Sequence, residues 1–148
     1  MNSPQAFISH NIASHGFSIT AVPTEEGSFA YTTGFTDLGF PEVIICGLRP
    51  EIAAHFMHDI YAAYKEGRGY PLDTPIDELA NLPCAFKAVT EQAAKEYCCQ
   101  TLYWYEDKDK TPSFIQMVLS DRKGLLPWQK GYDADYMRAQ RQLWETTH

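Results

Sequence analysis

Residues 17–48 read FSITAVPTEEGSFAYTTGFTDLGFPEVIICGL, and this stretch decides the fold. Apolar and polar residues alternate over 17–22 and again over 28–35, which is typical of half-buried strands. Turn-forming residues separate these two runs, and residues 36–41 form a second break that contains Asp, Gly and Pro. Residues 42–48 are almost continuously apolar, as in a central strand. Because both connections are short, the stretch predicts an antiparallel meander of three strands.

A long helix follows the meander over residues 51–66. Pro50 suits its first turn, and Gly67 suits its C-terminal end. The helix carries one apolar stripe, which we expect to cover the sheet. The stripe consists of Ile52, Phe56, Ile60 and Tyr64.

The rest of the chain adds two strands and three helices. The expected strands are 83–90 and 113–119, and the expected helices are 4–14, 91–102 and 133–145. Residues 68–82 are polar and contain prolines, which indicates a long connection with a short helical turn at 76–80. The elements together predict one α+β domain over 1–148, in which an antiparallel, curved sheet of five strands packs against two to four helices.

Composition narrows the class of protein. The 148 residues include 12 Lys plus Arg and 19 Asp plus Glu, so the net charge is −7. An acidic chain is poorly suited to nucleic acid or to an anionic membrane. Residues 1–9 lack the basic and apolar regions of a secretory signal, and no apolar run approaches a membrane span. We therefore expect a cytoplasmic protein with reduced cysteines.

Three motif-bearing segments follow one another in an order found elsewhere. They are FAYTTGF at 29–35, FPEV at 40–43, and QMVLSDRKG at 116–124 with PW at 127–128. This order resembles the bacterial domain-of-unknown-function family 4262, over about residues 15–145. Phe35 departs from the family's small aliphatic residue, and Leu119 and Ser120 stand where a Trp-Pro pair is common. The resemblance supports the element boundaries and implies no activity.

The motif segments also carry candidate ligand-binding residues. The first combines hydroxyls, a carboxylate and a glycine that permits close backbone approach. The second adds an amide, the carboxylate of a type I turn and an aromatic wall. These candidates are Tyr31, Thr32, Thr33, Gly34, Glu42, Gln116, Asp121 and Trp128. They predict a pocket for a small polar or planar molecule between the 29–42 and 116–128 segments. The alternative is that they only build strands, a bulge and a turn.

Residue types that bind metals form no complete motif. His55 and His58 are three residues apart on the long helix, but they lie opposite its apolar stripe and lack a third ligand. The four cysteines, Cys46, Cys84, Cys98 and Cys99, contain no C-x-x-C pair. We expect no metal site, and we expect the two cysteines in strands, Cys46 and Cys84, to fill the core.

Familiar catalytic signatures are missing, so the sequence names no catalytic residue and no cofactor. It contains no G-x-G-x-x-G, Walker loop, H-E-x-x-H or G-x-S-x-G. Three functions remain open. The first is the small-ligand pocket. The second is an acidic module for a basic protein partner, such as an immunity protein, an antitoxin or a counter-defence factor. The third is a flavin-binding oxidoreductase related to split-barrel reductases, by analogy of fold.

Overall fold

Five strands form one open, mixed sheet in the computed structural model, which describes residues 3–25 and 27–144. The strands are β1 (Ser18–Thr24), β2 (Gly27–Thr33), β3 (Glu42–Cys46), β4 (Cys84–Ala88) and β5 (Phe114–Leu119). Their order in the sheet is β1-β2-β3-β5-β4. The first three strands form the predicted antiparallel meander, in which Tyr31 lies opposite both Thr20 and Ile44. The α+β class and the five strands are therefore confirmed.

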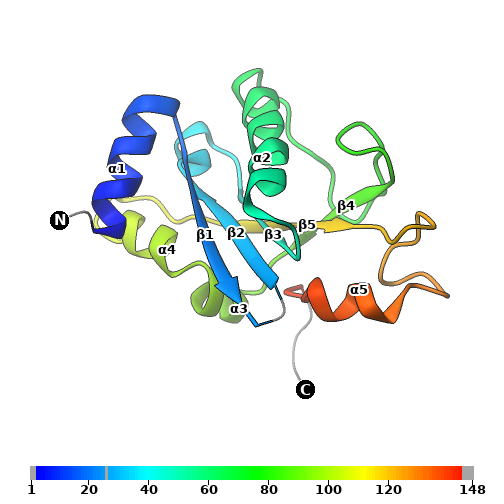
Figure 1. Cartoon of the computed structure of the whole chain (residues 1–148). Helices are drawn as coiled ribbons and strands as arrows, with labels where there is room; N and C mark the ends of the chain where they lie inside the picture. Colours follow the sequence, from blue (N-terminus) through cyan, green and yellow to red (C-terminus); the bar gives the residue numbers. More distant parts are fainter. Residues whose placement is uncertain (1–2, 26, 145–148) are drawn as a thin grey trace.

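The predicted antiparallel sheet is wrong in one respect, because β5 runs parallel to β3. Val43 lies opposite Ile115 in this parallel pair, whereas β4 and β5 are antiparallel. A parallel neighbour needs a long crossover connection. Here the whole stretch between β3 and β5 provides it (Figure 1). Loop lengths reveal the meander, but they contain no information on where the last strand inserts.

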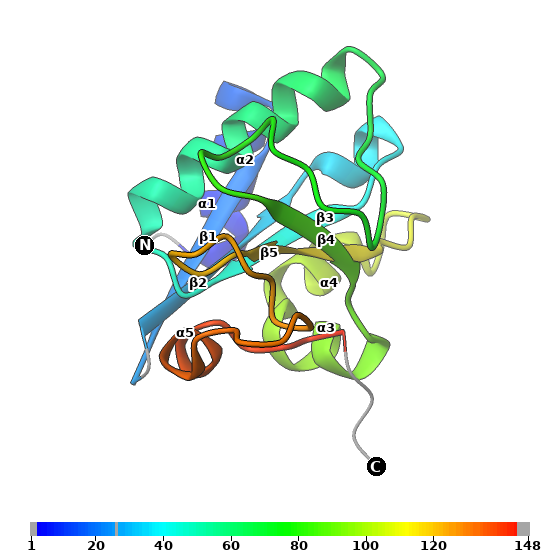
Figure 2. The ribbon, with the colours of Figure 1, turned by 90° about the vertical axis from the view of Figure 1, so that its right-hand side faces the viewer.

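Helix α2 (Pro50–Lys65) covers one face of the sheet (Figures 1 and 2). Its buried residues are Ala53, Met57, Ile60, Ala63 and Tyr64. The predicted stripe is thus only partly right, because Ile60 and Tyr64 are buried whereas Ile52 and Phe56 are half-exposed. The two half-exposed residues lie in the first two turns of the helix.

The opposite face of the sheet is covered by α3 (Glu91–Tyr97), α4 (Cys99–Tyr105) and the C-terminal segment (Figure 2). Every residue of β3 is buried, since both faces of this strand are covered. The predicted central position of β3 is therefore confirmed. Burial on both faces stabilises the sheet strongly, because each large apolar side chain removed from water contributes about 1.5–3 kcal/mol.

The remaining elements are α1 (Pro4–His15), the 3-10 turn η1 (Phe35–Leu38) and α5 (Ala134–Ala139). The described residues thus contain five α-helices, one more than the largest number predicted. The expected helix 91–102 is divided at Cys98, whose φ of −112° and ψ of 40° interrupt the helix. The expected helix 133–145 ends at Ala139, and Glu145 lies outside the described residues.

The long connection 68–82 runs along the outer edge of β4. The helical turn predicted at 76–80 is absent, because Ile76 pairs with Cys84 as an isolated β-bridge. Leu72 forms a second bridge with Phe86. These contacts satisfy backbone groups of β4 that would otherwise be unpaired at the edge of the sheet. Among the helices of residues 3–25 and 27–144, none combines the length and the apolar composition needed to cross a membrane.

Candidate functional site

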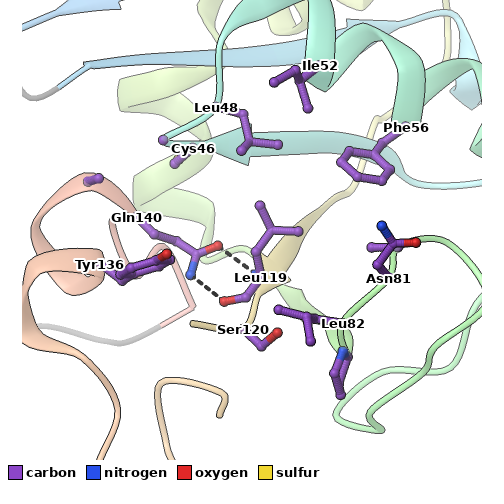
Figure 3. Close-up of a pocket in the computed structure, with 14 residues that line it drawn as sticks. Cys46, Leu48, Ile52, Phe56, Asn81, Leu82, Leu119, Ser120, Tyr136 and Gln140 are labelled. Carbon is purple, nitrogen blue, oxygen red and sulfur yellow. Dashed lines mark hydrogen bonds between the residues drawn. The ribbon is translucent and has the colours of Figure 1, made fainter. Parts of the chain in front are cut away.

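A cavity of about 320 Å³ lies at the carboxyl ends of β3 and β5 (Figure 3). Its wall is built by the loop after β3, the first turns of α2, residues 80–83, the end of β5, and α5. The large apolar side chains in this wall are Leu48, Ile52, Phe56, Leu82 and Leu119. The wall includes Ile52 and Phe56, the two residues of the predicted stripe that are half-exposed.

The parallel pairing of β3 and β5 creates this position. Both strands end at the same edge of the sheet, β3 at Cys46 and β5 at Leu119. The ladder between them stops at Ile44 and Gln116, because the chain turns away after Cys46 towards α2. Beyond the ladder, the space beside β5 is taken by α5 and by the cavity.

The side-chain amide of Gln140 occupies the place of a neighbouring strand beside the end of β5. Its Oε1 accepts a hydrogen bond from the Leu119 N–H at 2.7 Å, and its Nε2 donates to the Leu119 carbonyl at 2.9 Å. Its Nε2 also donates to the Tyr132 hydroxyl at 3.0 Å. The amide therefore satisfies both backbone groups of Leu119, as a neighbouring strand would. The sequence did not identify Gln140, because its partners are distant along the chain.

Gln116 binds the C-terminal segment in the same manner. It is fully buried, and its Nε2 donates to the Arg141 carbonyl at 2.5 Å. Its Oε1 accepts from the Leu143 N–H at 3.0 Å. Both partners of the Gln116 amide are therefore backbone groups of the C-terminal segment. Gln116 and Gln140 together attach α5 and the following residues to β5.

Glu42 is the centre of a buried hydrogen-bond network. Its carboxylate accepts from the hydroxyls of Thr32 at 2.7 Å and Thr36 at 2.6 Å. It also accepts from the N–H groups of Gly34, Phe35 and Thr36. Burial raises the pKa of Glu42, and the Thr36 and Thr32 hydroxyls with the N–H donors oppose that rise. The structure thus brings Thr32, Gly34 and Glu42 together, as a network that fixes the η1 turn.

Tyr31 and Thr33 connect β2 to α4. The Tyr31 hydroxyl accepts from the Gln100 N–H at 3.1 Å, and burial raises the pKa of Tyr31 to about 12. The hydroxyls of Thr33 and Thr101 lie 2.7 Å apart. Both predicted ligand-binding side chains are buried, and their polar atoms bond to α4.

Asp121 organises the turn after β5. It accepts from the N–H groups of Lys123 and Leu125 through Oδ1 and from that of Asp133 through Oδ2. Desolvation raises the pKa of Asp121, but the three N–H donors outweigh it and the pKa is lowered. The carboxylate thereby joins the turn to the residue that caps α5.

Trp128 lies apart from the other predicted site residues. Its side chain is 43% exposed, with the Lys87 ammonium 4.6 Å from the ring centroid and the Trp144 ring at 6.0 Å. None of the eight predicted residues is among the described residues that line the cavity. Three of them contribute indirectly, since Gln116 and Asp121 hold the segments around α5 and Glu42 begins β3.

The histidine pair on α2 and the cysteines lie in different surroundings. His55 and His58 are exposed, as predicted, with His55 3.6 Å from Asp59. Within residues 3–25 and 27–144, no three His, Cys, Asp or Glu side chains are grouped to hold a metal ion. Burial raises the pKa of Cys46, in the cavity wall, to about 12, so its thiol stays protonated at neutral pH. Cys46 and Cys84 are buried in strands, as expected.

Comparison with known proteins identifies a family for most of the chain. The model of a domain of unknown function (DUF4262) matches residues 11–133, which include the Glu42 network and the Asp121 turn. No curated protein and no solved structure matches the chain. The resemblance expected from the motif order is therefore confirmed. Because the match covers well over half of the 148 residues, the chain belongs to the DUF4262 family.

Proposed function

We propose that this protein binds a small, largely apolar molecule in the cavity at the ends of β3 and β5. The cavity itself is the observation that carries the proposal: its volume is about 320 Å³ and most of its large side chains are apolar. Small-molecule pockets occupy roughly 300–1,000 Å³ and are lined mainly by hydrophobic residues. In open sheets with parallel strands, ligands bind beyond the carboxyl ends of those strands. The position and the size therefore both favour a small-molecule site.

Exposed apolar surface in the wall supports the same function. Leu82 is 42% exposed, and Leu48, Ile52 and Phe56 are half-buried. An apolar occupant would remove these side chains from water, which contributes about 25 cal/mol for each Å² of apolar surface. Binding would thus be driven by burial, with few polar contacts.

The sequence-based hypothesis placed a pocket between the 29–42 and 116–128 segments. The proposed cavity meets the second segment through Leu119 and Ser120 and lies beyond the strand that follows the first. In this proposal Gln116 and Asp121 position the wall, while Leu48, Phe56 and their neighbours contact the ligand. The network around Glu42 keeps β3 in register.

The two other hypotheses stay predictions. The net charge of −7 is the basis for the hypothesis of a basic protein partner. The described residues of the cavity wall carry no charge, so the wall does not strengthen that hypothesis. The flavin hypothesis depended on analogy with split-barrel sheets, and the open mixed sheet gives that analogy no further support.

Extraction and binding measurements on a cavity-filling variant test the proposal. Ala80 lines the cavity, so Ala80→Phe would fill part of it, whereas Ala13 is exposed on α1 and Ala13→Phe is the matched control. We expect mass spectrometry of an organic extract to find an apolar compound bound to the wild type and to Ala13→Phe. Apolar compounds should also raise the melting temperature of these two proteins. Ala80→Phe should fold, but its extract should contain no such compound, and apolar compounds should not raise its melting temperature. Equal binding by Ala80→Phe, or no binding by the wild type, would contradict the proposal.

A further inference from the structure

We infer that the ligand of this cavity is an uncharged molecule with a hydrocarbon body of roughly ten non-hydrogen atoms and one hydrogen-bonding group placed at Asn81. The inference rests on the proposed function, and it names the class of ligand. It follows from the charge, the unused polar atoms and the volume of the wall.

Charge is missing from the wall. Among the described residues that line the cavity there is no Asp, Glu, Lys, Arg or His. The Arg122 Nε donates to the hydroxyl of Tyr136, a wall residue, but Arg122 itself is exposed and does not line the cavity. Transferring an unpaired carboxylate or ammonium group into such surroundings is strongly unfavourable. The part of the ligand inside the cavity is therefore neutral, and no charged side chain of the described wall compensates an ionised head group.

Two polar side chains of the wall, Gln140 and Tyr136, already have partners within the protein. The Gln140 amide bonds both backbone groups of Leu119. The Ser120 hydroxyl has no partner among the described residues, but its oxygen is sealed from solvent. Among residues 3–25 and 27–144, the Asn81 amide has no hydrogen-bond partner, and the residue is exposed. Asn81 thus offers a donor and an acceptor to a ligand.

The arrangement of the wall orients the ligand. Leu48, Ile52 and Phe56 lie across the cavity from Leu119, whereas Asn81 lies beside Leu82 (Figure 3). Asn81 and Leu82 are exposed, which places them at the mouth. The hydrocarbon body consequently enters first, and its polar group remains at the mouth near Asn81.

Volume limits the size of the hydrocarbon body. A water molecule occupies about 30 Å³ in the liquid, so 320 Å³ accommodates roughly ten non-hydrogen atoms. A phenylbutyl group has this size, and it can carry different head groups on an unchanged body.

A series of phenylbutyl compounds tests the inference on the full-length protein at neutral pH. The compounds are butylbenzene, phenylbutanol, phenylbutanoate and phenylbutylamine, and calorimetry gives their affinities. We expect phenylbutanol to bind most tightly, butylbenzene next, and both ions to bind more weakly than the alcohol by about tenfold or more. If either ion binds as tightly as the alcohol, the inference is overturned.

Two variants of Asn81 test its role. Asn81→Leu should abolish the difference in affinity between phenylbutanol and butylbenzene. Asn81→Asp should increase the affinity for phenylbutylamine, because it places a negative charge at the mouth of the cavity. Asn81 is exposed, so both variants should keep the wild-type melting temperature. Binding of the hydrocarbon with no preference for the alcohol would overturn the inference and leave the proposed function standing. Failure of all four compounds would contradict both.

Discussion

The Thr32 hydroxyl donates a hydrogen bond of 2.7 Å to the Glu42 carboxylate. The same hydroxyl accepts from the Val43 N–H at 3.0 Å, next to the point where the backbone ladder between β2 and β3 ends. The second carboxylate oxygen of Glu42 binds Gly34 and Thr36. One acidic side chain therefore joins the two strands and shapes the turn between them, which gives a structural reason for the Thr, Gly and Glu of the first two motif segments.

Glu42→Gln should destabilise the protein by roughly 2–4 kcal/mol. The amide would turn an NH₂ group towards N–H and hydroxyl donors, leaving buried donors without an acceptor. Urea unfolding followed by circular dichroism measures the change. Glu51→Gln, on the exposed face of α2, is the control and should leave the unfolding midpoint unchanged. A midpoint for Glu42→Gln equal to that of the wild type would refute the role of the network.

Gly34→Ala should be more destabilising than Gly27→Ala. The φ angles are similar, 124° and 134°, so both substitutions strain the backbone. A Cβ at Gly34 would lie 3.0 Å from the Phe17 Cα, whereas a Cβ at Gly27 meets nothing within 4 Å. The difference between their unfolding free energies therefore measures the close packing of Gly34 against Phe17, and we expect it to exceed about 1 kcal/mol. If both variants lose the same free energy of unfolding, the contact with Phe17 relaxes with little loss of stability.

Asp121→Asn should remove a pH-dependent part of the stability. The pKa of Asp121 is lowered in the folded state from its ordinary value of 3.8, so its contribution is fully present above that value. The contribution is lost as the pH falls through the lowered, folded-state pKa. The wild type should thus be more stable than the variant at neutral pH. The difference between their free energies of unfolding should become smaller at acidic pH. Unfolding curves at several pH values measure this. Asp77→Asn, at an exposed position, should show no such narrowing.

Gln140→Ala should loosen α5 and weaken ligand binding. It would leave the N–H and carbonyl of Leu119 without their partner, at a cost of about 1–3 kcal/mol. Hydrogen exchange should become faster for the amides of α5 and Leu119 but not for those of β1. Gln92→Ala, at an exposed position of α3, provides the control. Unchanged exchange in α5 would mean that Gln140 does not hold the helix.

The sequence predicted features that depend on neighbouring residues and missed those that depend on distant ones. The meander and α2 follow from alternation, helical spacing and short turns, and these signals are local. The insertion of β5 beside β3 and the partners of Gln116 arise only when segments far apart meet. One local signal was available for the cavity. Ile52 and Phe56 belong to the apolar stripe of α2, yet both stay half-exposed and line the cavity.

The sheet order has a consequence for synthesis on the ribosome. β5 is the last strand to emerge, yet it occupies the place between β3 and β4. Until residues 114–119 leave the exit tunnel, the nascent chain has an unpaired edge on β3 and an unpaired inner edge on β4. Such edges invite pairing with other chains. We expect chains truncated before residue 114 to need chaperones, and completion of β5 to end that dependence.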